Sequence, residues 1–252
     1  GSVLSDKIKT TRHNIDDYEV TFENAWGICD EDIYNKMIKV ADEYHQKKKP
    51  FLNFVMTTSN HRPYTYPENK IDIPSGKSRS GAVKYSDYAL QQMFKKAKNK
   101  PWFKNTIFVF VADHCASSAG KDEIDVANYH IPAIIYGENL IQPQKVTKLC
   151  SQIDIFPTLF GQLHWSYTSN FFGTDVLSKK YQERALIGTY LKLALQKDKV
   201  ITILSNKKTN TRYNWYKESN KLKVVPNNKT ELNETISWYQ TADYLYLNNK
   251  LN

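Results

Sequence analysis

Ile107-Phe-Val-Phe-Val-Ala-Asp-His114 is the stretch that decides the fold of this chain. Six apolar residues run without a break up to Ala112, and an acid and a histidine follow. An unbroken apolar run rich in Val, Ile and Phe is typical of a strand buried on both faces. In an open α/β sheet the chemistry lies just beyond the carboxyl ends of such strands. We therefore expect Asp113 and His114 at the edge of a functional crevice.

The chemistry of this pair has more than one interpretation. A carboxylate oxygen beside an imidazole nitrogen suits a divalent cation such as Zn²⁺ or Mn²⁺. Spacing alone leaves open that Asp113 is a capping residue and His114 an ordinary loop residue. A hydrolytic triad with Ser117 is disfavoured, because adjacent side chains on a strand point to opposite faces. The chain also lacks the Gly-x-Ser-x-Gly elbow of such hydrolases.

Length and composition limit the class of protein. The chain has 252 residues, enough for one large domain or a domain with a smaller appendage. Its net charge of +9 would suit an anionic partner such as a membrane surface or nucleic acid, but the lysines are scattered, so we interpret them as a solvated surface and expect no nucleic-acid partner. No membrane span and no signal peptide are visible. The cysteines, Cys29, Cys115 and Cys150, lie far apart, and one disulfide among them stays open.

Two further apolar runs resemble the first. Residues 51–56 lead into a polar loop that carries His61, and residues 131–136 follow His130. Amphipathic helices are predicted from residue 30, over 81–98 and over 151–163, between or after these runs. We therefore predict an α/β fold, a three-layer sandwich whose mostly parallel sheet contains all three runs.

The composition changes near residue 180. Short alternating segments separated by Asn, Lys and Ser predict an antiparallel meander, and the spacing over 230–247 predicts a final helix. We expect a main domain over 1–180 and a small C-terminal α+β subdomain over 181–252. The polar, irregular residues 1–20 are expected to be a loosely held lead-in.

The candidate site residues gather at one predicted sheet edge. His61, Asp113, His114 and His130 each flank a predicted strand. Three histidines converging with an acid are typical of a metal or phosphate site.

Five motifs now resemble a known family. The run that ends in Asp113-His114 is similar to the Asp-His metal motif of the sulfatase-like branch of the alkaline phosphatase superfamily, and in particular of lipoteichoic acid synthases and related phosphoglycerol transferases. Four other segments resemble motifs of this family in the same order, within roughly residues 20–180: Trp26–Asp32, Ser59–Tyr64, Tyr129–Pro132 and Asp154–Leu159.

The resemblance implies a function. Such enzymes transfer phosphoglycerol or phosphoethanolamine from a phospholipid head group to an envelope glycan acceptor, through a threonine nucleophile bound to a metal. Asp113 and His114 would bind that metal, Mn²⁺ or Zn²⁺, with Mg²⁺ or Ca²⁺ as further options. His61 and His130 would contact the substrate, and His130 could instead bind a second metal.

The chain also departs from the family. The nucleophilic threonine and another acidic ligand belong upstream of the Trp-Gly motif, where Thr10-Thr11 lacks a preceding buried strand. The sulfatase signature Cys/Ser-x-Pro-x-Arg is missing as well. We therefore expect no catalytic nucleophile here. We expect this chain to be the C-terminal part of a longer enzyme and to be inactive by itself. The whole enzyme is expected to be anchored by N-terminal helices at the extracytoplasmic face of a bacterial inner membrane. A sulfate-ester or phosphodiester hydrolase and a non-catalytic envelope-binding domain remain alternatives.

Overall fold

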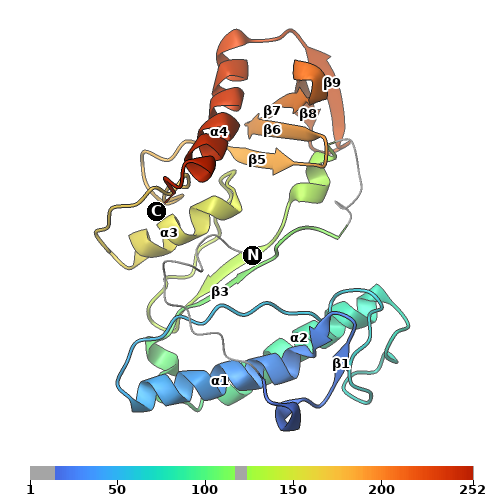
Figure 1. Cartoon of the computed structure of the whole chain (residues 1–252), viewed down its shortest axis with the longest axis vertical. Helices are drawn as coiled ribbons and strands as arrows, with labels where there is room; N and C mark the ends of the chain where they lie inside the picture. Colours follow the sequence, from blue (N-terminus) through green and yellow to red (C-terminus); the bar gives the residue numbers. More distant parts are fainter. Residues whose placement is uncertain (1–14, 117–123, 252) are drawn as a thin grey trace. The chain divides into compact units, whose positions relative to one another are not determined.

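The computed structural model describes residues 15–116 and 124–251 (Figure 1). The chain divides after Thr106 into two compact units. The predictions for residues 1–14 and for Ser117 lie outside the described residues. The proposed domain boundary near residue 180 stays a prediction.

The first unit is built on two helices. α1 (Asp30–Gln46) begins with three acidic residues, which favour the positive end of the helix dipole. α2 (Arg79–Ala97) is capped by Ser78, whose hydroxyl accepts a hydrogen bond from the backbone N–H of Gly81 at 3.1 Å. The helices pack together, with small residues of α2 buried. A 3-10 turn, η2 (Asp17–Glu19), and a short hairpin, β1 (Glu23–Asn24) and β2 (Gly27–Ile28), precede α1.

The prediction of a strand over 51–56 is wrong. Phe51 lies against Trp102, but Leu52 and Phe54 are each 84% exposed, and Met56 is exposed as well. Burial alternates along the segment with the two-residue period of an extended chain. No hydrogen-bonded neighbour strand exists for it among the described residues. The apolar run therefore has the sequence of a buried strand without the pairing that makes one.

The second unit contains the other two apolar runs. After a 3-10 turn, η3 (Phe103–Asn105), at the end of the first unit, β3 (Phe108–Val111) pairs with β4 (Ala133–Tyr136). This pair is antiparallel, where a parallel arrangement was expected. A parallel pair needs a crossover, usually a helix. In the described part of the connection only a 3-10 turn, η4 (Val126–Tyr129), forms.

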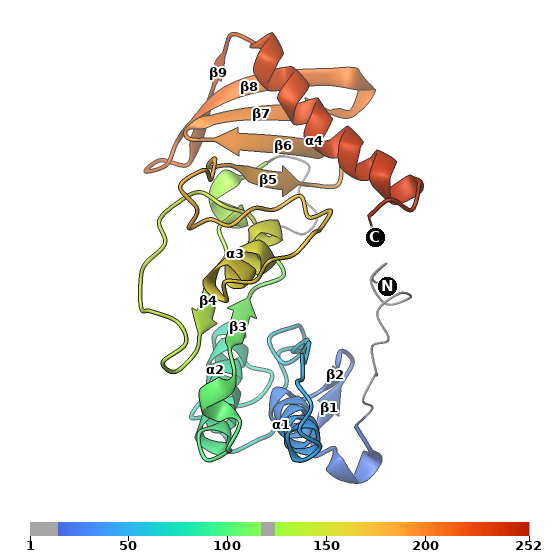
Figure 2. The same ribbon diagram turned by 90° about the vertical axis from the view of Figure 1, so that its left-hand side faces the viewer.

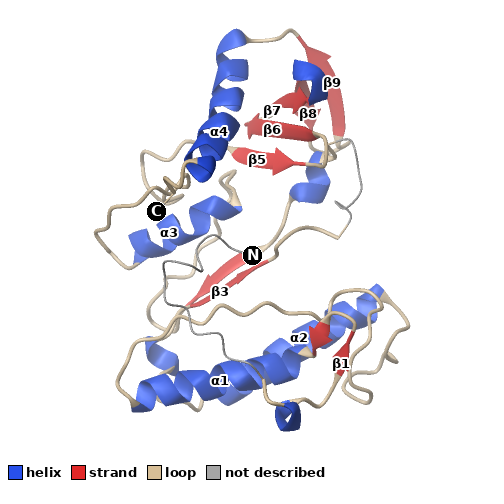
Figure 3. Ribbon diagram, viewed as in Figure 1, coloured by secondary structure: helices blue, strands red, loops and turns tan. Residues whose placement is uncertain are grey.

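The rest of the second unit follows the predictions. A 3-10 turn, η5 (Gln152–Asp154), leads into α3 (Ile155–Gln162). The meander is confirmed as a five-stranded antiparallel sheet in sequence order. The tail is confirmed as a helix, α4 (Lys229–Leu247), which lies along this sheet (Figures 2 and 3). The Tyr239 hydroxyl of α4 donates to the carbonyls of Ile187 and Ala194. The elements are β5 (Ala185–Gly188), β6 (Lys192–Lys197), β7 (Val200–Ser205), the 3-10 turn η6 (Asn206–Lys208), β8 (Thr209–Tyr216), β9 (Lys221–Val225) and α4 (Lys229–Leu247).

Among the residues that the structure describes, no helix combines the length and the apolar character needed to cross a membrane.

Candidate functional site

The end of β3 presents Asp113 and His114 to solvent, with 79% and 57% of their side chains exposed. The backbone N–H of His114 donates to Asp113 Oδ1 at 2.8 Å. The imidazole Nδ1 lies 2.7 Å from the carbonyl oxygen of Cys115. Since a carbonyl only accepts, Nδ1 carries the proton in the neutral ring, and Nε2 is then the nitrogen with the lone pair that a metal would need. Nε2 lies 3.5 Å from Asp113 Oδ2, so one oxygen and one nitrogen donor face the same space.

A glutamine holds this strand end in place. The Gln152 side-chain amide donates to the carbonyls of Ala112 and Asp113, at 2.7 and 2.9 Å. These carbonyls lie just past the last ladder residue of β3, where backbone groups otherwise lack partners. The position of the Asp113-His114 pair therefore depends on η5, the turn that carries Gln152.

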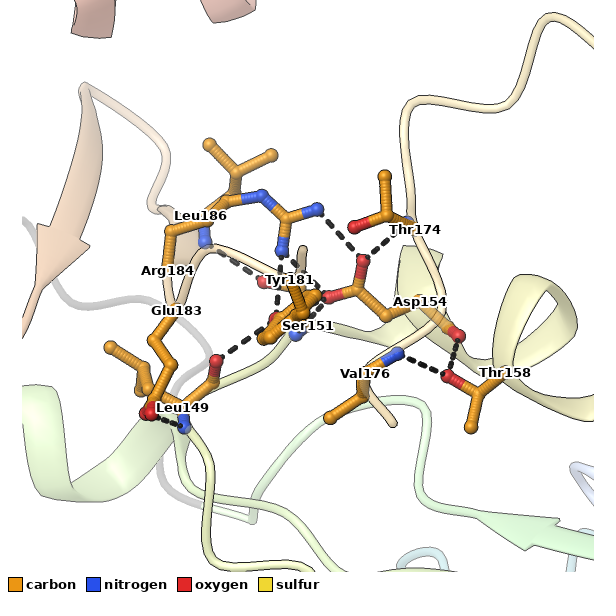
Figure 4. A network of polar contacts seen from close by, with 10 residues as sticks. All are labelled: Leu149, Ser151, Asp154, Thr158, Thr174, Val176, Tyr181, Glu183, Arg184 and Leu186. Carbon is orange, nitrogen blue, oxygen red and sulfur yellow. Dashed lines mark hydrogen bonds and ion pairs between the residues drawn. The ribbon is translucent and has the colours of Figure 1, made fainter. Parts of the chain in front are cut away.

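The turn η5 is anchored by a buried ion pair (Figure 4). Asp154 is 1% exposed, and Arg184 donates to both of its carboxylate oxygens, at 2.6 and 2.7 Å. The backbone N–H groups of Ser151 and Thr174 donate to the same carboxylate, each at 2.9 Å, and the Tyr181 hydroxyl lies at 3.2 Å. Burial raises the pKa of Asp154, but the hydrogen bonds from Arg184 and the two amides outweigh it, so this pKa lies below its usual value.

The same network fixes the start of α3. The Thr158 hydroxyl donates to the Asp154 carbonyl at 2.7 Å and accepts from the Val176 N–H at 3.0 Å. The backbone at Gly173 approaches η5 so closely that a Cβ there would lie 1.8 Å from the Ile153 carbonyl oxygen. In the described structure, the Asp154–Leu159 motif therefore supports the site through packing and hydrogen bonds.

His130 lies at the same end of the strand pair as Asp113. It follows η4 and precedes β4, and the N–H of Ala112 donates to the Pro132 carbonyl at 3.4 Å. In a parallel pair, a residue before β4 and a residue after β3 would lie at opposite ends. The antiparallel pairing places both at one end. No hydrogen bond or ion pair between His130 and the Asp113-His114 pair is present in the described structure.

The loop that carries His61 belongs to the first unit and is clamped to the start of α1. Asp30 and Ser59 are both buried. One Asp30 carboxylate oxygen accepts from the N–H groups of Thr58 and Ser59, each at 2.9 Å, and the Ser59 hydroxyl accepts from the Asp30 N–H at 3.0 Å. The Ser86 hydroxyl of α2 donates to the other Asp30 oxygen at 3.0 Å. The buried side of the loop is thus fixed, whereas His61 itself is exposed.

The His61 ring has two neighbours. It stacks on the Trp26 indole with ring centroids 3.4 Å apart, and its Nδ1 lies 3.4 Å from the Arg62 carbonyl oxygen. The roles of His61 and His130 as substrate contacts stay predictions.

The described residues fit a metal in part. The Asp113 carboxylate and the His114 Nε2 are donor types that Zn²⁺ and Mn²⁺ accept. Within residues 15–116 and 124–251, however, no group of three or more His, Cys, Asp or Glu side chains could hold a metal ion. Two donors fall short of the three protein ligands of a typical catalytic zinc.

Sequence reasoning missed the residues that support the pair. Arg184 is 30 residues from Asp154, and Gln152 is 39 residues from Asp113. No local pattern marks a lone Arg or Gln as the partner of a distant group. The Asp154 motif was the available signal, because a buried carboxylate requires a partner.

Comparisons with known proteins agree with the motifs. A family model described as Sulfatase matches residues 4–165. The lipoteichoic acid synthase-like protein YvgJ of Bacillus subtilis is 29% identical over 191 residues, which are 66% of this chain and 30% of that protein. Phosphoglycerol transferase I of Escherichia fergusonii is 29% identical over 102 residues, 38% of this chain and 13% of that protein. The chain thus spans less than a third of these relatives.

Two solved structures share the fold. A protein in the alkaline phosphatase superfamily from Vibrio parahaemolyticus matches with a TM-score of 0.85 and 32% identity, over 92% of this chain and 58% of that one. The lipoteichoic acid synthase LtaP of Listeria monocytogenes matches with a TM-score of 0.69 and 20% identity, over 88% of this chain and 60% of that one. The predicted alkaline phosphatase-like α/β fold is confirmed. Together with the family model, which matches well over half of its length, this shows that the chain belongs to the sulfatase family.

Proposed function

We propose that the protein containing this chain transfers a phosphoglycerol or phosphoethanolamine group from a phospholipid to an envelope acceptor, in a metal-dependent reaction. The observation that carries the proposal is the supported Asp113-His114 pair at the end of β3 in a chain of the sulfatase family. Relatives named as a lipoteichoic acid synthase-like protein and a phosphoglycerol transferase support the reaction class. The proposal concerns the whole protein, because the chain covers only part of these relatives.

The chain's own residues would have distinct roles. Asp113 and His114 would bind the divalent metal, Mn²⁺ or Zn²⁺, with Mg²⁺ or Ca²⁺ as further options. When bound, such a metal lowers the pKa of the nucleophile and holds an oxygen of the transferring group. The nucleophile would be a threonine outside this chain. His61 and His130 would offer hydrogen bonds to the phosphate or to the acceptor, where charge develops during transfer.

The charge of the chain agrees with an anionic substrate. A net charge of +9 would favour the approach of the protein to a surface of anionic lipid head groups. Membrane anchoring through helices outside this chain, at the extracytoplasmic face of a bacterial inner membrane, is part of the proposal.

The decisive assay uses the whole natural protein in detergent or in vesicles. We expect release of labelled diacylglycerol from phosphatidylglycerol or phosphatidylethanolamine, and loss of both turnover and bound metal in Asp113→Ala. Asp243→Ala is the matched control, since Asp243 is also an exposed acid of the second unit. Turnover of an aryl sulfate without lipid cleavage would instead assign a sulfate-ester hydrolase. Absence of metal and of any turnover would leave a binding domain.

We also propose that the 252-residue chain is inactive by itself. No residue in it matches the family's nucleophile, and its described residues supply two metal donors. Purified chain with added Mn²⁺ or Zn²⁺ should not hydrolyse a phosphodiester. Metal-dependent turnover that disappears on replacing Thr10 or Thr11 would contradict this.

A further inference from the structure

Trp26 is an exposed aromatic residue with one defined neighbour. Its side chain is 53% exposed, although Trp is usually largely buried. One face of the indole stacks on the His61 ring, with centroids 3.4 Å apart and an angle of 28° between the planes. Both residues lie in the first unit. The contact therefore joins two exposed rings and adds little to the core.

The backbone around Trp26 is held firmly. Its N–H donates to the Asn24 side-chain oxygen at 2.8 Å, and the Asn24 amide donates to the Thr65 hydroxyl at 3.1 Å, just beyond the His61 loop. On the other side of the hairpin, the Thr58 hydroxyl donates to the Ile28 carbonyl at 2.6 Å. The hairpin that presents the indole and the loop that presents the imidazole are thus bonded to each other on both sides of the stack.

The stack leaves one nitrogen of His61 available. The Arg62 carbonyl can only accept, so Nδ1 is the protonated nitrogen in the neutral ring. Nε2 has no hydrogen-bond partner among the residues the structure describes. An exposed histidine without neighbours would rotate among several rotamers. Stacking restricts that rotation and fixes the direction in which Nε2 points.

We propose that Trp26 is a positioning residue, which holds the His61 ring so that Nε2 meets a phosphate oxygen or an acceptor hydroxyl of the substrate. This inference rests on the proposed function for its activity, but the stack and its effect on phosphate binding can be measured without it. Aromatic stacking contributes enough to expect a fall of about three- to ten-fold in kcat/KM when it is lost.

The first test follows the His61 ring in the 252-residue chain by NMR, with His61→Ala to assign its signals. The ring current of a stacked indole should move the His61 ring protons upfield, and Trp26→Ala should return them toward the values of an exposed histidine. Titration with sn-glycerol 3-phosphate should perturb these protons less in Trp26→Ala than in the natural chain. Tyr18→Ala, which removes another exposed aromatic residue of the same unit, should change neither result.

The second test measures transfer by the whole protein. Trp26→Ala should lower kcat/KM about three- to ten-fold, and Trp26→Phe, which keeps a stacking ring, should restore most of it. His61 signals that do not move in Trp26→Ala would overturn the inference, whatever the enzyme does. A lost stack with unchanged kcat/KM would also overturn it and leave the proposed function intact. If the natural protein cleaves no phospholipid, the proposed function fails, and the ring-proton shifts together with the phosphate titration decide whether Trp26 orients His61.

Discussion

Replacing Asp154 by alanine should destabilise the second unit strongly. The substitution leaves Arg184, 5% exposed, without the carboxylate that it contacts at 2.6 and 2.7 Å. It also removes the acceptor for the backbone N–H groups of Ser151 and Thr174. Removing one partner of a buried ion pair typically costs about 3–5 kcal/mol, because the other charge stays buried and unpaired. We expect a loss of this size in the free energy of unfolding.

The assay is urea unfolding followed by circular dichroism, with Glu234→Ala as the control. Glu234 pairs with Lys197 at 3.0 Å, but both side chains are partly exposed, so the control should lose at most about 1 kcal/mol. The double variant Asp154→Leu with Arg184→Met removes both charges and should lose only about 2 kcal/mol, mainly for the two unpaired amides. If Asp154→Ala lost no more than the control, the ion pair would not anchor η5 and the reasoning would be refuted.

Three further predictions concern the same region. Gln152→Ala removes both side-chain hydrogen bonds to the end of β3, so the free energy of unfolding in urea should fall by about 1 kcal/mol. The whole protein should also bind its metal more weakly. Unchanged metal affinity would argue against a supporting role for Gln152. Gly173→Ala forces a Cβ against the backbone and should lower the free energy of unfolding by roughly 2–3 kcal/mol. In the control Gly188→Ala the new Cβ meets only a side chain at 3.7 Å, so the free energy of unfolding should change by less than about 0.5 kcal/mol in the same measurement. Folding lowers the pKa of Asp154, so the stabilisation by its carboxylate should be complete above the unfolded pKa of about 3.9 and should disappear as the pH falls through the lower folded value. The difference in free energy of unfolding between the natural chain and Asp154→Asn should therefore become smaller in acid. A difference that grows in acid would contradict the lowered pKa.

Local pattern was a good guide where an element depends on its own residues. Acids before Ile33 and the spacing of apolar residues predicted α1, α2 and α4 to within a few residues, whereas the capping role of Ser78 came from the structure. The alternation after residue 185 predicted the meander, because each hairpin pairs neighbours in sequence. The motifs that end in Asp113-His114 and begin at Asp154 predicted the family, which the family model and the solved structures confirmed.

The sequence by itself determined the helices, the meander, the family and the residues available for chemistry, since these depend on periodicity and residue type within short segments. Only the tertiary structure decided that β3 and β4 are antiparallel, that residues 51–56 lack a paired neighbour, and that Arg184 neutralises Asp154. The physical reason is that an apolar run indicates that a segment prefers to be buried. It does not indicate which distant strand will pair with that segment or which distant charge will form an ion pair with it. Those partners are set by hydrogen bonds and packing between residues far apart in the chain, as in the stack of Trp26 on His61.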